Sequence, residues 1–414
     1  MSSTPKDILQ HNREKLLSIL QEKEVLILHT RDIMMKGDEE FFHSTDSWFR
    51  YFFGDVGAEE MIGIIYIENQ NLKSILGIEE KSEIQQKFQG SITKEELTEQ
   101  TGVNEILYKE ELIEYIKKLI TQKNFKIKYC LNEKFNYFSN YNTLLEQLKN
   151  DENTKIENII SKLSTLREVK DEFEIGCITK ANEIAKEAFH ELLKSIKGLK
   201  TEQEVFAKLS YEIFKRNSQH AFYPIVASGR NALTLHYSKH NQKLQENDLL
   251  LLDFGCEYLG YKSDISRTIP VSGKFSQIQK KVYEAVLRVQ KFAISQVRAG
   301  LKFKDFELRV AQNMGEELVT LEIISQEELE EDIKCVRKYF PHRCSHHLGL
   351  DTHDCGAYEE MREAMVITIE PGLYIEELGI GIRIEDNVVV RVGGCENLSK
   401  GIMKKVEELE KFMK

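Results

Sequence analysis

The chain has 414 residues, 41% of them hydrophobic, which is long enough for two domains with apolar cores. Its formal net charge of −11 argues against a nucleic-acid-binding surface. No apolar run reaches the length of a secretory signal or a membrane span, so we expect neither export nor a membrane partner. The seven cysteines form no Cys-x-x-Cys pair, which favours reduced thiols in a cytoplasmic protein.

The first part of the chain mixes helix and strand signals. Apolar spacing predicts helices over residues 11–21 and 105–122 and strands over residues 25–28 and 61–67. A polar, charge-rich stretch at residues 149–155 marks a domain boundary. We therefore expect an α/β domain over residues 1–160 and a second domain over residues 161–414.

The second domain alternates long helical patterns with apolar strand patterns, so the fold class is α+β (mixed α/β). A helical period at residues 156–166 crosses the expected boundary, and further helical periods occur at residues 171–194, 201–217, 276–299 and 303–318. The acidic patch at residues 326–332 is most simply a solvated helix face. The strand patterns contain the candidate functional residues.

Two apolar runs carry Asp253 and Asp264 and flank a segment that contains Gly260, as in a β-hairpin. A turn at Tyr258 and Leu259 would place the two acids directly opposite each other. Their Cβ atoms would then lie about 4.5–5.5 Å apart. Carboxylates at that distance can share or flank one metal ion.

A second strand pair repeats this arrangement with Glu370 and Glu385. A turn at Glu377 and Leu378 would place these glutamates opposite each other. The two hairpins suggest two pseudo-equivalent halves that face a shared pair of metal ions. The alternative is four exposed, unrelated acids at strand ends. If the four carboxylates are buried together, they need cations beside them, because carboxylates a few ångströms apart cannot all stay ionised otherwise.

Histidines supply the remaining donors. Residues 342–354 contain four of the eleven histidines, among them His342, His346 and His353, and His236 lies just before the first hairpin. Imidazole can bind a metal, donate to a developing oxyanion or move a proton near neutral pH. Four carboxylates and one imidazole suit two Mn, Co or Zn ions, so the pattern predicts a two-metal hydrolytic site.

The motifs around these residues resemble those of the pita-bread metallopeptidases, and among them aminopeptidase P. They are Leu-Leu-Asp253-Phe-Gly, Ser-Asp264-Ile-Ser-Arg-Thr, Ser-His346-His-Leu-Gly-Leu-Asp-Thr-His353-Asp, Thr-Ile-Glu370-Pro-Gly-Leu-Tyr374 and Ile-Arg383-Ile-Glu385-Asp. The resemblance covers most of the chain, most strongly from Arg167 onward. It implies a C-terminal pita-bread catalytic domain and a smaller, creatinase-like N-terminal domain that serves oligomerisation or access to the active site.

The resemblance also implies how the metal ions are bound. The ligands would be Asp253, Asp264, His346, Glu370 and Glu385. Asp264 and Glu385 would bridge the ions, Asp253 would chelate one, and His346 and Glu370 would complete the other. Manganese is the metal most often found in aminopeptidase P, with cobalt and zinc as alternatives.

The expected reaction is attack on the scissile carbonyl by a hydroxide that bridges the two metal ions. Glu370 would act as the general base, and Tyr374 and Arg383 would orient the carboxylates. Histidines that match catalytic or substrate-binding positions are His236, His342 and His353. The substrates would be peptides with proline in the second position, whose tertiary amide has no N–H.

The sequence departs from the family pattern at two places. Arg343 and Cys344 follow His342, where the family usually has glycine after the histidine, and Ala364 replaces another common glycine. Neither change touches an expected metal ligand. A bulkier loop at Arg343 could narrow or recharge the pocket, so these changes bear on substrate preference.

Three functions compete. The first is an Xaa-Pro aminopeptidase, and the second is a prolidase-type dipeptidase, which often has a long insertion between the two glutamate strands. That connection is short here, which favours the aminopeptidase. The third is a non-catalytic pita-bread binding protein, which would have lost ligands that this chain keeps. Methionine aminopeptidase shares the ligands but normally lacks so large an N-terminal domain.

Two further expectations concern assembly. The resemblance implies a homodimer or homotetramer.

Trp48, the only tryptophan, lies in an aromatic segment, residues 45–54. We expect it in the core, because large aromatic side chains dominate core burial. The alternative is that this segment caps the active site of a neighbouring subunit.

Overall fold

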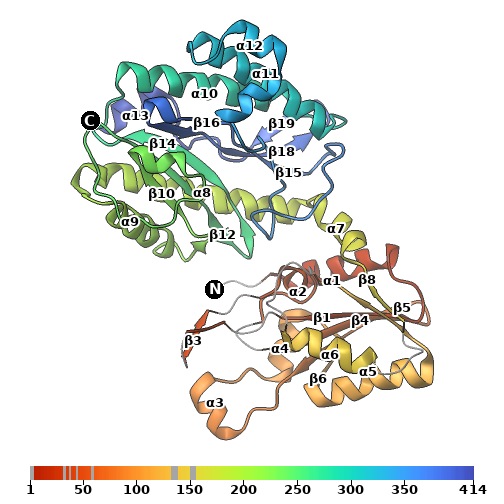
Figure 1. The fold of residues 1–414 in the computed structure, drawn as a ribbon. Coiled ribbons are helices and arrows are strands. Elements are labelled where there is room, and N and C mark those ends of the chain that lie inside the picture. The colour runs from red at the N-terminus through yellow and green to blue at the C-terminus, as the bar shows by residue number, and fades with distance from the viewer. Residues whose placement is uncertain are drawn as a thin grey trace. The chain divides into compact units, whose positions relative to one another are not determined.

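The computed structural model describes residues 4–30, 34–36, 39–42, 45–56, 60–131, 139–149 and 155–414 (Figure 1). The chain divides into two compact units, Met1–Leu166 and Arg167–Lys414. Both units combine helices with strands, which confirms the mixed α/β class.

A six-stranded mixed sheet forms the centre of the first unit, with the order β6-β5-β4-β1-β7-β8 (Figure 1). β4 is antiparallel to both neighbours, and the other three pairs are parallel. The strands are β1 (Glu24–His29), β4 (Ile62–Glu68), β5 (Asn71–Ile78), β6 (Glu105–Tyr108), β7 (Lys126–Tyr129) and β8 (Ile156–Asn158). A separate hairpin consists of β2 (Met34–Lys36) and β3 (Glu39–Phe42).

Helices cover both faces of this sheet. The described helices of this part of the chain are α1 (Lys6–Glu14), α2 (Ser47–Phe53), α3 (Glu83–Gln89), α4 (Lys94–Thr101), α5 (Lys109–Lys123), α6 (Ser139–Lys149) and α7 (Ile160–Glu168), the last of which crosses the boundary between the units. Leu112 of α5 and Leu144 of α6 belong to one core with Val25 of β1. On the opposite face, Phe53 of α2 packs against Gly63 of β4, where a Cβ would lie 2.2 Å from the ring. The glycine therefore allows the helix to pack closely.

Trp48 lies in α2 and is only 7% exposed, so its predicted core position is confirmed. Asp46 begins this helix, because its carboxylate accepts hydrogen bonds from the backbone N–H groups of Trp48 and Phe49. The capping interaction and the aromatic burial together explain why this segment is helical.

Two helices predicted in the first unit begin too early. Glu105–Tyr108 and Ile156–Asn158 form strands β6 and β8, and the helices α5 and α7 follow them. Each strand pairs in parallel with a strand distant in sequence, a contact that apolar periodicity does not reveal. The helix predicted over residues 11–21 is displaced in the other direction, since α1 begins at Lys6.

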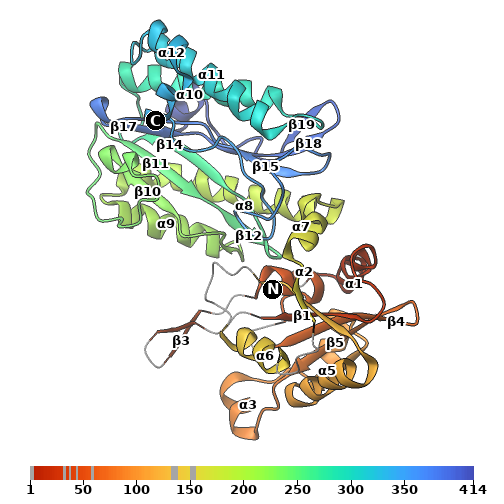
Figure 2. The ribbon, with the colours of Figure 1, turned by 45° about the vertical axis from the view of Figure 1, so that its right-hand side comes forward.

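The second unit begins with a helix pair and two three-stranded antiparallel sheets, β10-β11-β14 and β13-β12-β9 (Figure 2). α8 and α9 contact strands of this half. The elements are α8 (Glu172–Ser195), α9 (Glu202–Phe214), β9 (Gln219–His220), β10 (Ile225–Ser228), β11 (Leu249–Phe254), β12 (Cys256–Tyr258), β13 (Tyr261–Lys262) and β14 (Ile265–Pro270). A reciprocal capping box between Asp171 and Glu174 begins α8 where the helical period predicts it.

The other half repeats this plan, with helices followed by antiparallel strands. α10 contacts β15, β16, β17 and β19 and covers this half (Figure 2). The elements are α10 (Gln277–Gln296), α11 (Phe303–Thr320), α12 (Gln326–Glu331), β15 (Val366–Ile369), β16 (Gly372–Ile375), β17 (Ile380–Arg383), β18 (Asp386–Arg391), β19 (Gly394–Asn397) and α13 (Val406–Phe412). Side chains from both halves form one apolar core.

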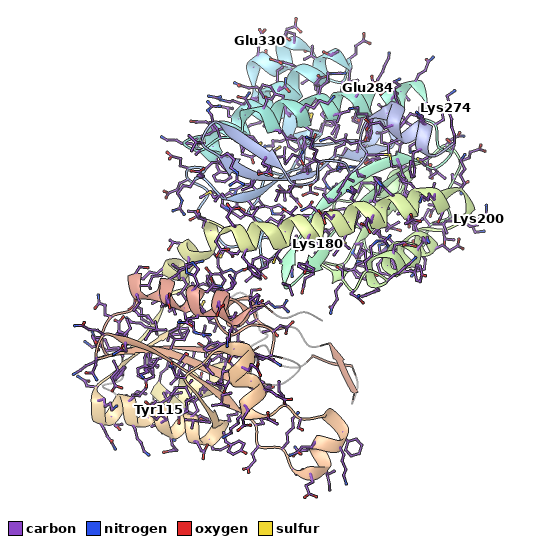
Figure 3. All side chains as sticks on the ribbon, turned by 180° about the vertical axis from the view of Figure 1, so that it is seen from behind. Tyr115, Lys180, Lys200, Lys274, Glu284 and Glu330 are labelled. Carbon is purple, nitrogen blue, oxygen red and sulfur yellow. The ribbon has the colours of Figure 1, made fainter. Side chains whose placement is uncertain are left out.

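The acidic patch predicted to be a solvated helix face is α12, which has no buried residue. Its Glu330 points outward from the surface (Figure 3). None of the helices among the described residues combines the length and the apolar character required to cross a membrane.

Gly255 lies between β11 and β12, where the chain closely approaches the segment before Asp264. A Cβ there would lie 2.0 Å from the backbone oxygen of Ser263, so Gly255→Ala forces the strands apart. We expect a loss of roughly 2 kcal/mol in the free energy of unfolding, measured by urea denaturation. Gly176→Ala is the control. It lies in the exposed interior of α8 with nothing near its Cβ, and should gain roughly 0.5–1 kcal/mol. Equal effects of the two substitutions would contradict the packing argument.

Candidate metal centre

Asp253 and Asp264 come from the first hairpin of the second unit. Asp253 lies in β11 opposite Ser266 of β14, so the prediction that it directly faces Asp264 is wrong. Asp264 lies two residues before Ser266, directly before β14. In an extended chain, residues two apart point to the same face. The two carboxyl groups are therefore diagonal neighbours, close enough to interact.

The turn of this hairpin explains the shift. Tyr258 pairs with Tyr261, so the turn residues are Leu259 and Gly260, one position later than predicted. Both have positive φ, +52° and +87°, as two-residue hairpin turns of the mirror-image type require. Glycine adopts this conformation without steric cost, and its place in the turn sets the register.

Glu370 and Glu385 lie opposite each other, as the second hairpin predicts. β16 pairs with β17 on one side of them and β15 pairs with β18 on the other, and the same register continues through both pairs. The two glutamates occupy the break between these pairs, directly after β15 and directly before β18. Side chains at such a break are free to turn toward a common point.

His346 reaches the acids from a segment that runs beside β15. The N–H of Thr368 donates to the backbone oxygen of His346 at 2.9 Å. His346 Nε2 lies 3.4 Å from Asp264 Oδ2 and 3.5 Å from Glu370 Oε1. Its Nδ1 lies 2.9 Å from the backbone oxygen of His347, an acceptor, so the hydrogen belongs on Nδ1. The lone pair of Nε2 is therefore available to a cation.

The donor set fits divalent cations. One ligand atom each from Asp264, His346 and Glu385 lies within 4.8 Å of the other two. Burial, together with the neighbouring carboxylates, raises the pKa of Asp264 and of Glu385 well above the ordinary range. The buried oxygens Oδ1 of Asp253 and Oε1 of Glu385 accept no hydrogen bond from any residue that the structure describes. A cation would pair these oxygens and stabilise the charged carboxylates.

Arg383 is the buried cation beside this cluster. Its Nη2 donates to Asp253 Oδ2 at 2.6 Å and its Nε donates to Ser266 Oγ at 2.7 Å. Ser266 Oγ in turn donates to Glu385 Oε2 at 2.9 Å. Burial alone would lower the pKa of Arg383, but Tyr374 and Asp253 raise it well above its usual value. The guanidinium thus stays charged and holds two of the carboxylates in position.

A chain of hydrogen bonds leads from Arg383 to His342. Arg383 Nη1 donates to the hydroxyl of Tyr374 at 2.6 Å, and that hydroxyl lies 2.9 Å from His342 Nε2. His342 Nδ1 is 3.7 Å from Glu370 Oε2. Burial and the charge of Arg383 lower the pKa of His342 to about 4. The ring is therefore neutral at pH 7, when the tyrosine hydroxyl can donate to it.

A cavity of about 540 Å³ opens onto these groups. The predicted site residues on its wall are Asp253, Asp264, His346, Glu370, Glu385, His236, His342, His353 and Arg383. The ring of His353 packs edge-on against that of His346, 4.5 Å between centroids. Burial, and to a smaller extent the charge interaction with His346, lowers the pKa of His353 to about 4. Tyr374 lies behind the wall, in a small apolar cluster with Tyr237.

Several supporting residues were not predicted. Asn387 exchanges hydrogen bonds with the backbone N–H and oxygen of Asp264, at 3.0 and 2.7 Å. Glu307 of α11 accepts from the N–H of Cys344 with both carboxylate oxygens, at 3.1 and 3.0 Å. Ser266 could have been found, since it shares the strand face of Asp264. Glu307 is one acid among many on an amphipathic helix, and nothing in its spacing distinguishes it.

Two family models match the chain. The model of metallopeptidase family M24 covers residues 176–391, and that of the aminopeptidase P N-terminal domain covers residues 9–128. The chain belongs to metallopeptidase family M24. Because the first model spans more than half of the chain and the second matches the N-terminal unit, it is a family M24 enzyme of the aminopeptidase P type.

Curated relatives and solved structures agree with this assignment. The Escherichia coli Xaa-Pro aminopeptidase is 29% identical over 100% of this chain and 99% of its own length. Human Xaa-Pro aminopeptidase 3 is 29% identical over 97% of this chain and 84% of its own length. Escherichia coli aminopeptidase P with the inhibitor Pro-Leu superposes with a TM-score of 0.91 at 27% identity, covering 100% of this chain and 99% of that one. A Bacillus anthracis structure assigned to aminopeptidase P gives 0.91 at 31% identity, covering 99% and 98%.

The buried carboxyl group of Glu307 makes a pH-dependent contribution to stability. Burial raises its pKa from 4.5 to about 7, so the native state keeps a proton that the unfolded chain releases. Stability is therefore lost as the pH rises from about 4.5 to about 7. Glu307→Gln removes this titration. Its unfolding free energy relative to wild type should rise by up to about 3 kcal/mol between pH 5 and pH 8, measured by urea denaturation.

Glu316→Gln is the matched control, because Glu316 lies on the exposed face of the same helix. The wild-type difference between the two pH values should persist in this variant. A Glu307→Gln variant whose stability relative to wild type is the same at pH 5 and pH 8 would contradict the assignment.

Proposed function

We propose that this chain removes the N-terminal residue from peptides whose second residue is proline, with the help of two divalent metal ions. The observation that carries the proposal is the convergence of four carboxylates and one imidazole on one cavity. Relatives of nearly the same length are named Xaa-Pro aminopeptidases, which supports the substrate class.

The metal ions would be held by both hairpins. Asp264 and Glu385, the most deeply buried of the four cluster acids, suit the bridging positions, with Asp253 on one ion and His346 and Glu370 on the other. Oxygen donors with a single nitrogen fit Mn²⁺ first and Co²⁺ or Zn²⁺ as alternatives. The Escherichia coli relative has been solved in a zinc-substituted form with product, which supports tolerance for more than one metal in that enzyme.

The protein groups divide the chemical work. When bound, the metal pair supplies Lewis acidity and lowers the pKa of the attacking water. Glu370 takes the proton from that water and delivers it to the leaving nitrogen. A general base must lie within hydrogen-bonding distance of the proton it takes, and Glu370 belongs to the cluster that would hold the water. His353 and His236 on the cavity wall stabilise the oxyanion or hold the substrate carbonyl, and neutral His342 binds substrate beside Glu370.

The cavity also suits proline. The nitrogen of the scissile Xaa-Pro bond is part of proline's ring and carries no hydrogen, so a site for this bond must bind the carbonyl and the ring without an N–H donor. Phe222, Tyr223, Ile225 and Leu235 provide an apolar side to the wall, opposite in character to the acids. An apolar surface of this kind accepts the pyrrolidine ring.

The dipeptidase alternative is less well supported. The connection between β16 and β17 consists of residues 376–379 only, too short for the insertion that would close the cavity to longer peptides. The non-catalytic alternative requires lost ligands, and all five candidates converge here. A role of the N-terminal domain in oligomerisation or active-site access, a homodimer or homotetramer, and a cytoplasmic location stay predictions.

Purified protein with Mn²⁺ should release the first residue from Xaa-Pro-Yaa peptides. Asp264→Ala and Glu385→Ala should abolish this activity, because each removes a ligand from both ions. Calorimetric titration of Mn²⁺ should show weakened binding in both variants. Glu396→Gln, an exposed glutamate paired with Arg391, serves as the control and should keep wild-type turnover.

The specificity claim has its own test. Met-Ala-Yaa peptides should be cleaved far more slowly than Xaa-Pro-Yaa peptides, and Xaa-Pro dipeptides no faster than longer ones. Equal turnover of peptides without proline would overturn proline specificity. Cleavage of dipeptides alone would favour the dipeptidase.

Glu370→Gln tests the proton-transfer role. The amide keeps the size of the side chain but cannot take a proton, so kcat should fall by roughly 10²–10⁴-fold. Peptide affinity, measured by calorimetry on the metal-loaded variant, should change much less. Unchanged kcat would remove Glu370 from this role, and parallel losses of kcat and metal affinity would make it a ligand only.

A further inference from the structure

Arg343 stands on the wall of the cavity, one residue after His342. The backbone around it is anchored on both sides. His342 Nδ1 lies 2.8 Å from the backbone oxygen of Arg343, and Glu307 accepts from the N–H of Cys344. The side chain itself is exposed. The main chain is thus held in place while the side chain, which lines the cavity, is exposed.

The guanidinium of Arg343 lies over an aromatic ring. Its Cζ lies 4.8 Å from the centroid of the Tyr358 ring. The Tyr358 ring also makes edge-to-face contacts with Phe303 and His347, with centroid separations of 5.3 and 4.9 Å. A guanidinium stacked on an aromatic face keeps its N–H donors in its own plane. The donors of Arg343 therefore stay available to a planar acceptor.

Among the described residues, no acid pairs with these donors. In the part of the chain that the structure describes, Arg343 forms no ion pair. Arg383, the other cation of the cavity wall, is already bound to Asp253 and Tyr374. The acids on the wall are the four carboxylates proposed to hold metal ions. The wall thus offers one positive group with unused hydrogen-bonding capacity.

Geometry indicates which part of a peptide reaches it. The scissile bond must lie at the carboxylate cluster, and His342 Nδ1 is only 3.7 Å from Glu370 Oε2. Arg343 is the next residue after His342 and lines the same cavity. Proline and the residue after it span at most about 7 Å. The residue after proline therefore lies within reach of the guanidinium.

We propose that Arg343 selects substrates with a carboxylate on the residue that follows proline, a conclusion that rests on the proposed function. The carboxylate has two sources, the C-terminus of a tripeptide or an acidic side chain in the third position. Arginine binds either through paired N–H donors. Arg343 is thus a specificity-determining residue, and short or acidic Xaa-Pro peptides are the preferred substrate class.

The test compares matched peptides on the Mn²⁺-loaded enzyme. Ala-Pro-Ala is compared with its C-terminal amide, and Ala-Pro-Glu-amide with Ala-Pro-Gln-amide. In wild type, kcat/KM should favour the carboxylate in at least one pair by roughly three- to tenfold, mainly through KM. Arg343→Met should bring that ratio close to one, and Arg343→Glu should reverse it. The preference should weaken at high salt.

Arg309→Met is the matched control. It removes an equal charge from the exposed face of α11, where Arg309 contacts Gln296, and should keep the wild-type ratio. Preference in the first pair alone identifies the terminal carboxylate, and preference in the second alone identifies an acidic side chain. A wild-type ratio of one in both pairs, or an unchanged ratio in Arg343→Met, overturns the proposal.

Binding provides a readout independent of turnover. Pro-Leu corresponds to the part of a substrate beyond the scissile bond, and calorimetry can compare its affinity with that of Pro-Leu-amide in wild type and Arg343→Met. If amidation weakens binding more in wild type than in Arg343→Met, the result supports recognition of the terminal carboxylate by Arg343. If no Xaa-Pro peptide is cleaved, the proposed function fails, while this comparison still decides whether Arg343 binds a carboxylate.

Discussion

Mutual repulsion among four carboxylates is the constraint on which the C-terminal unit depends. Asp253, Asp264, Glu370 and Glu385 share one cavity wall, and burial with like charge raises the pKa of Asp264 and Glu385. Arg383 offsets part of this charge through Asp253. Further cations are needed to stabilise the remainder in ionised form. The repulsion that destabilises the carboxylate cluster therefore also favours the binding of divalent metal ions to it.

The fold meets this demand by joining two similar halves at the acids. The backbone N–H of Glu385 donates to Ser266 of the other half at 3.0 Å, and Asn387 holds the backbone of Asp264. Each acid lies at the end of a strand or at a break in pairing, where its backbone is tied but its side chain can turn inward. The rigid sheets set the distances, and the loops that carry His236 and His353 complete the cavity.

Sequence patterns predicted the register of one hairpin and missed that of the other. Alternation and matched spacing located Glu370 opposite Glu385, because the loop between β16 and β17 is symmetric about the expected turn. In the first hairpin, alternation fits turns that differ by one residue almost equally well. The positive φ of Gly260 decides between them and moves Asp253 opposite Ser266. The strands β6 and β8 were missed for a related reason, since their partners are distant in sequence.

The sequence by itself determined the class of fold, the five candidate ligands and the histidines around them, because spacing and residue chemistry are local properties. Only the tertiary structure decided which groups support them. Glu307, Asn387 and the stacking of Arg343 on Tyr358 depend on segments brought together by folding. Contacts of this kind leave no periodic signal, since a single side chain from a distant helix or loop makes each one. The surroundings of a residue, more than its identity, set its charge state and its freedom to bind substrate.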